Sequence, residues 1–168
     1  HIKNLSPLNE TIFDRLKEVS NDLIFADSTG LELSAEKFLT ASILFKDLLK
    51  SEIKTQNVGL LLPSTAAGAF INYSLLLMGK TAVNLNYTSE IESIKQSINE
   101  AKIKTLITSK KFVEKLELKG IILEEVFHML ELNYLEDLKP KISKRKSLFT
   151  FLSVKFLPSF LLKIIHLT

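Results

Sequence analysis

Apolar positions along the chain follow two different spacings. Helical spacing predicts helices over 9–21, 34–51, 64–79, 90–101 and 110–116. Short apolar or alternating runs predict strands over 23–26, 31–33, 58–62, 81–85 and 105–108, with 121–123 and 132–135 as further candidates. The runs 23–26 and 31–33 also fit a small hairpin. Strands that alternate with helices are typical of βαβ units. We therefore predict an α/β fold with a doubly wound, mostly parallel sheet flanked by helices and followed by a C-terminal amphipathic helical tail.

Polar residues just before three of these helices predict where the helices begin. Ser64 or Thr65 would cap helix 64–79, and Ser109 would cap helix 110–116. Ser89 with Glu92 three residues later has the spacing of a capping box for helix 90–101.

The stretch GLLLPSTAAGAF at 59–70 has the strand–turn–helix outline of many nucleotide phosphate sites. It lacks the glycines and lysine of G-x-x-x-x-G-K-[ST], and G-x-G-x-x-G is absent as well. We therefore interpret it as scaffold, with small residues at 66–69 that allow close packing of helix on sheet. Asn84 and Asn86 stand at the end of the next strand, where either a ligand contact or a turn would use them.

Composition narrows the chemistry further. The chain of 168 residues is 46% hydrophobic and 24% charged, as an ordinary globular domain is, and it has no cysteine, which excludes disulfides and thiolate chemistry. Its three histidines are far apart, so a zinc site is not expected. Glu136 and Asp137 are adjacent, and on an extended chain they would point in opposite directions. We predict no catalytic, cofactor-binding or metal-ligating residue in this chain.

Charge is distributed unevenly. Seven of the 22 basic residues and none of the 19 acidic residues lie in 139–168, so residues 1–138 carry a net charge of −4. This boundary predicts an α/β unit over 1–138 and a basic, apolar tail over 139–168.

The tail has an amphipathic helical pattern. Lys155, Ser159, Lys163 and His166 would form one polar stripe, and Pro158 would kink the helix or start a second one. We predict a membrane- or partner-facing surface made of Lys144, Arg145, Lys146, Phe149, Phe151, Lys155, Phe156, Phe160 and Lys163. An anionic membrane surface, the remainder of a longer protein and a second copy of the chain all fit this surface. Nucleic acid does not, because the aromatics do not interleave with the lysines.

An ordered series of segments in 28–109 resembles the N-terminal part of the AMP-forming acyl-adenylating synthetases. It comprises VGLLLPS, a helix ending near glycine, the strand AVNLN and the strand LIT. The version LLLMGKTAVNLNYT, with YLEDL further on, is similar to bacterial acyl-[acyl carrier protein] synthetases that act as 2-acylglycerophosphoethanolamine acyltransferases.

This resemblance implies an enzyme that uses ATP and Mg²⁺ to form an acyl-adenylate from a fatty acid. The acyl group then passes to acyl carrier protein or coenzyme A, for reacylation of a lysophospholipid. The family's phosphate loop ending in Pro-Lys-Gly is not in this sequence. We therefore expect an inactive N-terminal fragment, without a cofactor of its own, whose main partner is the remainder of the synthetase.

The N-terminus shows no signal-peptide pattern, and we expect a peripheral location at the cytoplasmic side of the bacterial inner membrane. A non-catalytic α/β module that binds a membrane surface or a partner is the alternative.

Overall fold

The computed structural model describes residues 7–27 and 30–166. The strands in these ranges are β1 (Leu23–Ala26), β2 (Glu32–Ser34), β3 (Asn57–Leu61), β4 (Thr81–Asn84), β5 (Thr105–Thr108) and β6 (Glu131–Tyr134). The helices there are α1 (Leu8–Glu18), α2 (Ala35–Glu52), α3 (Ala66–Leu77), α4 (Ile91–Glu100), α5 (Lys110–Glu117), α6 (Glu124–Phe127), α7 (Leu135–Leu138), α8 (Lys144–Phe156) and α9 (Ser159–His166). A 3₁₀ turn, η1 (Lys139–Lys141), joins α7 to the segment before α8.

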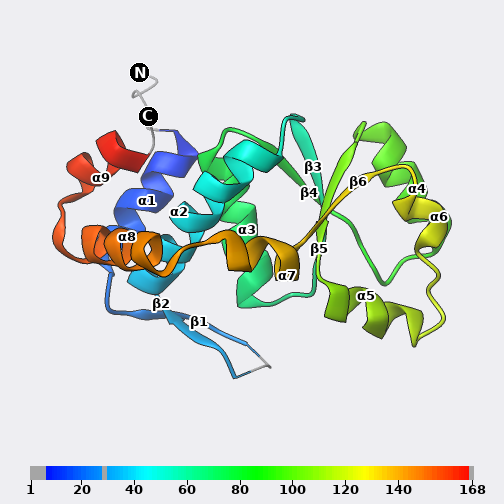
Figure 1. Ribbon diagram of the computed structural model, residues 1–168, viewed down its shortest axis with the longest axis horizontal. Helices are drawn as coiled ribbons and strands as arrows, with labels where there is room; N and C mark the ends of the chain where they lie inside the picture. The colour runs from blue at the N-terminus through cyan, green and yellow to red at the C-terminus, as the bar shows by residue number, and fades with distance from the viewer. Residues whose placement is uncertain (1–6, 28–29, 167–168) are drawn as a thin grey trace, which may run out of the picture.

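A parallel sheet in the order β4-β3-β5-β6 lies at the centre of the molecule (Figure 1). Val58 of β3 pairs with Ala82 of β4 on one side and with Thr105 of β5 on the other. Strands β1 and β2 form a separate antiparallel hairpin. The predicted α/β fold with a doubly wound parallel sheet is therefore confirmed.

The two faces of the sheet bury different sets of side chains. Leu61 and Leu106 face a core formed with α4, α5 and α6. Val58, Leu60 and Ile107 face a second core formed with α2 and α3. Strands apolar on both faces are typical of a sheet covered by helices on each side.

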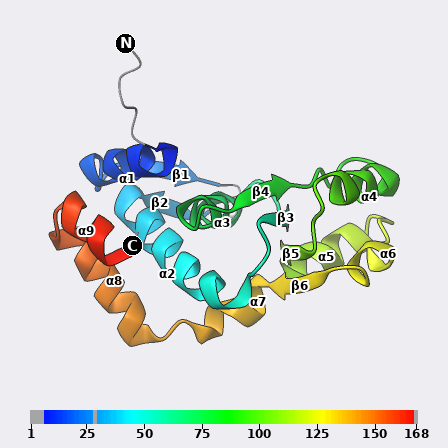
Figure 2. The same ribbon diagram turned by 90° about the horizontal axis from the view of Figure 1, so that it is seen from above.

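A third core lies beyond α2, on the side away from the sheet. Phe13 of α1, Phe38 and Leu39 of α2, Val154 of α8 and Leu162 of α9 are all buried in it. Helices α1, α8 and α9 gather at one end of the molecule and α4, α5 and α6 at the other (Figure 1). Seen from above, α2 runs between α8 and α3 (Figure 2). The C-terminal helices thus pack on the N-terminal helices of the same chain.

Two glycines permit close approach of neighbouring atoms, one in the sheet and one at the start of α3. A Cβ atom at Gly59 of β3 would lie 2.9 Å from Leu106 Cδ1, and one at Gly68 of α3 would lie 2.9 Å from the Pro63 carbonyl oxygen. The tight fit at Gly68 is against the turn that precedes α3, so close packing of residues 66–69 on the sheet stays a prediction.

Three local predictions were wrong. Ser89 is not the cap of α4, because the Asn86 side chain accepts bonds from the Thr88 N–H and hydroxyl, and the resulting turn delays the helix until after Glu90. Residues 121–123 form no strand, since Leu123 is buried against α4 and α5 and begins α6 instead. Residues 135–138 form helix α7 and not an extended chain.

Candidate functional site

The carboxyl ends of the parallel strands meet at one edge of the sheet, where α/β proteins bind their ligands. Helix α3, which follows β3, covers one face, and helix α5, which follows the neighbouring strand β5, covers the other. The chain therefore changes direction between β3 and β5, and the N-termini of α3 and α5 lie beside this switch point. A bound anion would contact the free N–H groups of such helices.

The N-terminus of α3 is occupied by a carboxylate from the hairpin. Thr65 is at the N-cap position, but its side chain makes no cap hydrogen bond. The Asp27 carboxylate accepts from the Ala66 N–H at 3.0 Å, and its other oxygen accepts from the Leu31 N–H at 3.4 Å. The prediction that Ser64 or Thr65 caps this helix was wrong, because a residue 39 positions earlier than Ala66 provides the acceptor.

The N-terminus of α5 is occupied in a similar way. Ser109 caps it as predicted, accepting from the Phe112 N–H at 3.4 Å. Glu136 of α7 accepts from the Ser109 hydroxyl at 2.7 Å and from the Lys110 N–H at 2.9 Å. Partial burial favours a higher pKa for Glu136, but the bonds from the Lys110 N–H and the Ser109 hydroxyl hold its pKa below the ordinary value. Glu136 is thus an anionic partner of α5, and the adjacent Asp137 pairs with the Lys110 ammonium group.

A cavity of about 460 Å³ lies between the ends of β3 and β4, in front of α3. On its wall, Asn72 and Asn84 exchange amide hydrogen bonds of 2.9 and 3.0 Å. Asn86 forms the turn described above, which is one of the two uses that the sequence left open. The lining residues include amides, hydroxyls and the Tyr87 phenol, but no histidine, carboxylate or ammonium group. The cavity can therefore hydrogen-bond a polar group but offers no acid–base catalyst for neutral pH.

The residues at this edge do not fit nucleotide phosphates. Asp27 and Glu136 each place a carboxylate at the helix N-terminus that a phosphate would use, and two anions in one place repel each other. Within 7–27 and 30–166, histidine, aspartate and glutamate side chains form no cluster that could hold a metal ion.

The predicted surface residues of the tail lie on two helices. Lys144, Arg145 and Lys146 form the first turn of α8 and are exposed, with Lys146 paired to Asp47 at 3.1 Å. Arg145 lies on the same outer face of the helix as the aromatic residues that follow.

The predicted aromatic residues differ in exposure. Phe149, Phe156 and Phe160 point outward with 61%, 72% and 63% of their surface accessible, whereas Phe151 is half-buried. Lys155 is exposed, and its ammonium group lies 5.8 Å from the ring centres of both Phe151 and Phe156. These residues remain candidates for a contact surface.

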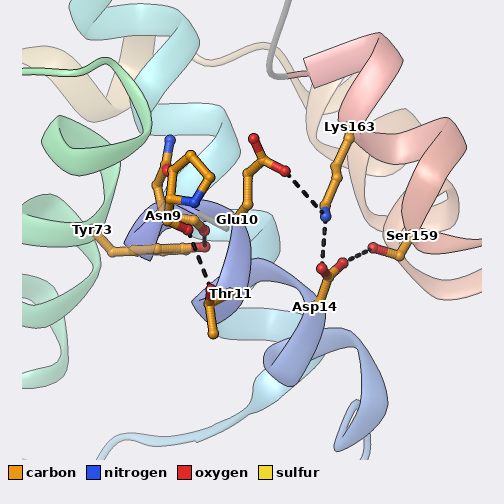
Figure 3. Close-up of polar contacts among 8 residues, drawn as sticks. Asn9, Glu10, Thr11, Asp14, Tyr73, Ser159 and Lys163 are labelled. Atoms are coloured by element: carbon orange, nitrogen blue, oxygen red, sulfur yellow. Dashed lines mark hydrogen bonds and ion pairs between the residues drawn. The ribbon is translucent and has the colours of Figure 1, made fainter. Parts of the chain in front are cut away.

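The polar stripe predicted along the tail does not exist as one face, because Pro158 separates α8 from α9. Lys163 pairs with Asp14 of α1 at 2.6 Å and with Glu10 at 3.6 Å, and the Ser159 hydroxyl also donates to Asp14 (Figure 3). Partial burial favours a higher pKa for Asp14, yet the bonds from Lys163 and Ser159 keep that pKa below the ordinary value. Lys163 thus faces α1, while Lys155 faces solvent.

The last residue of α9 is buried. His166 is 6% exposed, its backbone carbonyl accepts a hydrogen bond from the buried Lys46 ammonium group, and Lys46 also pairs with Asp47 at 3.2 Å. Burial lowers the pKa of His166. In the described part of the chain, no helix is both long enough and apolar enough to cross a membrane.

No protein-family model matches the sequence. Solved structures of other proteins share the fold at low sequence identity. The N-terminal subdomain of NpsA from Klebsiella oxytoca, in complex with 3-hydroxyanthranilyl-AMSN, has a TM-score of 0.64 at 13% identity over 84% of this chain and 33% of that chain.

Two further structures show the same fold. VinN in complex with 3-methylaspartate has a TM-score of 0.65 at 15% identity, over 85% of this chain and 38% of its own. O-succinylbenzoate coenzyme A synthetase (MenE) from Bacillus subtilis in complex with AMP has a TM-score of 0.60 at 18% identity, over 80% of this chain and 33% of its own. The chain thus spans between about a third and two fifths of the length of these three solved chains.

Proposed function

We propose that this chain is the N-terminal part of an AMP-forming acyl-activating ligase and supplies scaffold without catalytic residues. The observation that carries the proposal is the fold likeness to NpsA, VinN and MenE. It extends over 80–85% of this chain but over only 33–38% of each of those chains. A shared fold at this level of identity leaves function to be argued from the site.

The strand ends support the scaffold role. Asp27 and Glu136 hold the N-termini of α3 and α5 in place and leave no helix terminus beside the switch point for a phosphate. In the proposed enzyme, ATP and Mg²⁺ are bound by protein outside this chain, and the remainder of the synthetase is its partner. No turnover is assigned to these 168 residues alone.

The substrate class in this proposal is a fatty acid, activated as its acyl-adenylate and passed to acyl carrier protein or coenzyme A for lysophospholipid reacylation. The support is the segment LLLMGKTAVNLNYT, which forms the end of α3, strand β4 and the turn after it. A peripheral location at the cytoplasmic side of a bacterial inner membrane belongs to the same proposal.

The gene sequence downstream of the Thr168 codon provides a direct test. The proposal predicts a loop rich in Ser, Thr and Gly that ends in Pro-Lys-Gly, encoded within the next few tens of residues. An open reading frame that continues for a hundred residues without such a loop would count decisively against it.

A second candidate is a non-catalytic α/β module that binds an anionic membrane surface, which the outer face of α8 favours. Leu148, Phe149, Leu152 and Phe156 lie within about 100° of one another around the helix and are 42–72% exposed. Exposed apolar residues beside a basic first turn are typical of a helix that lies in the membrane interface.

Flotation with anionic and neutral vesicles tests this second candidate. The double substitution Phe149→Ser and Phe156→Ser should abolish flotation with anionic vesicles. Leu118→Ser is the control and should leave flotation unchanged, because Leu118 is 90% exposed but lies at the C-terminal end of α5, away from α8. If neither the wild type nor Leu118→Ser floats with anionic vesicles, the membrane is excluded as the partner. Dimerisation abolished by the same double substitution would instead identify a second copy as the partner.

A further inference from the structure

A groove of about 560 Å³ runs between α2 and the start of α8. Apolar side chains from three segments line it: Leu44 and Phe45 of α2, Ile142 before α8, and Leu148 and Phe151 of α8. None of its lining residues lines the cavity at the strand ends. The volume is in the range of small-molecule sites, which are also mostly apolar.

Two lysines join the apolar residues in the lining. Lys139 of η1 and Lys144 of α8 are both exposed, and neither forms an ion pair with any described residue. Their neighbours differ, because Lys141 pairs with Glu52 at 3.0 Å and Lys146 pairs with Asp47 at 3.1 Å. The two lysines that line the groove are therefore available to an anion.

The combination selects a ligand with an anionic head and an apolar chain. An apolar tail would cover Leu148, which is 59% exposed, and the half-buried Ile142 and Phe151, above a floor of buried Leu44 and Phe45; covering them is favourable in proportion to the area removed from water. A carboxylate beside Lys139 and Lys144 would form charge-assisted bonds. A neutral hydrocarbon would leave the lysines unused, and a compact polar anion would leave the apolar lining uncovered.

We propose that this groove binds one long-chain carboxylate, with the carboxylate at Lys139 and Lys144 and the alkyl chain along Leu44, Phe45 and Phe151. The proposal deepens the proposed function, because it places a fatty acid on this chain away from the cavity at the strand ends. Binding here needs neither ATP nor any catalytic residue. The two proposals can therefore fail separately.

Isothermal titration of the chain with dodecanoate, below its micelle concentration and without nucleotide, tests the proposal. The expected result is saturable binding of one molecule per chain. Affinity should fall by roughly fourfold for each buried methylene removed. Decanoate is shorter than dodecanoate by two methylenes, so it should bind about sixteenfold more weakly. The methyl ester, which lacks the charge, should bind at least tenfold more weakly.

Matched variants separate the groove from its surroundings. The double variant Lys139→Glu and Lys144→Glu should weaken dodecanoate binding at least tenfold. Arg145→Glu should weaken it far less than the double lysine variant, because Arg145 is exposed and does not line the groove. Ala41→Leu, which fills the groove from α2, should also weaken binding.

Four results would overturn the proposal. The first is that dodecanoate does not bind, and the second is that Arg145→Glu and the double lysine variant lose the same affinity for dodecanoate. The third is that dodecanoate and its methyl ester bind with equal affinity. The fourth is that the chain binds only anionic vesicles or micelles. The last would identify a membrane surface in place of a single lipid. Circular dichroism of each variant verifies its fold, and the charge variants remain informative if Ala41→Leu does not fold.

Discussion

Replacement of Asp27 by alanine tests how α3 is held at the switch point. The substitution removes the acceptor of the Ala66 N–H at 3.0 Å and of the Leu31 N–H at 3.4 Å. Loss of an N-cap side chain costs about 0.5–2 kcal/mol, and for a domain of this size each kcal/mol lowers Tm by about 2–4 °C. We therefore expect Asp27→Ala to unfold about 1–8 °C below the wild type.

The same substitution should open α3 to anions. With the carboxylate gone, sulfate can reach the free N–H groups, so sulfate should raise the Tm of Asp27→Ala more than that of the wild type. The assay is thermal unfolding in chloride and in sulfate at equal ionic strength. Asp22→Ala is the control, because Asp22 is exposed and its side chain has no hydrogen-bond partner among the described residues. Equal Tm values for Asp27→Ala and Asp22→Ala would refute the capping role.

Three further predictions concern packing, pH and the docking of α9. Gly68→Ala should destabilise the fold by about 1–3 kcal/mol in urea denaturation, because the added Cβ would lie 2.9 Å from a backbone oxygen; a neutral or stabilising result would contradict this packing. Burial lowers the pKa of His166 from 6.5, so the unfolded chain takes up a proton first as pH falls. Stability should therefore be complete above pH 6.5 and decline below it by at most about 1.4 kcal/mol per pH unit, and a His166→Gln variant with the same slope would disprove the assignment. Lys163→Met should speed amide exchange in α9 because Asp14 loses its ion-pair partner, whereas Lys155→Met should not; equal exchange rates would show that the ion pair does not hold the helix.

Local pattern was sufficient to predict most of the elements. The hairpin, the buried strands β3 and β5, and the start of α5 at Ser109 all follow from short-range spacing and turn chemistry. Where the pattern gave a wrong prediction, a neighbouring side chain formed a different local structure. The Asn86 side chain forms a turn that removes Ser89 from the cap position.

The contacts that define the strand ends could not be predicted in the same way. Asp27 reaches Ala66 across 39 residues, and Glu136 reaches Lys110 across 26. An aspartate before a glycine indicates a turn, but no local signal shows that its carboxylate will cap a distant helix. Tertiary packing brings such residues together: β6, which precedes Glu136, pairs with β5, and α2, which follows the hairpin, packs on α3.

The tail shows the same limit. Its amphipathic spacing indicated two helices or one kinked helix, and in the structure α8 and α9 are separate helices on either side of Pro158. The carboxylates of α1 that bind Lys163 and Ser159 lie about 150 residues earlier, at Glu10 and Asp14. Sequence spacing alone assigned Lys163 to an outer surface, whereas its ion pairs direct it toward α1.

The most direct test of the central proposal is fatty-acid-dependent ATP–pyrophosphate exchange, measured for these 168 residues and for the longer product of the same gene. We expect no exchange from the chain alone and exchange from the longer product with Mg²⁺. Exchange catalysed by the 168 residues alone, or its absence from a folded longer product given a range of fatty acids, would contradict the account.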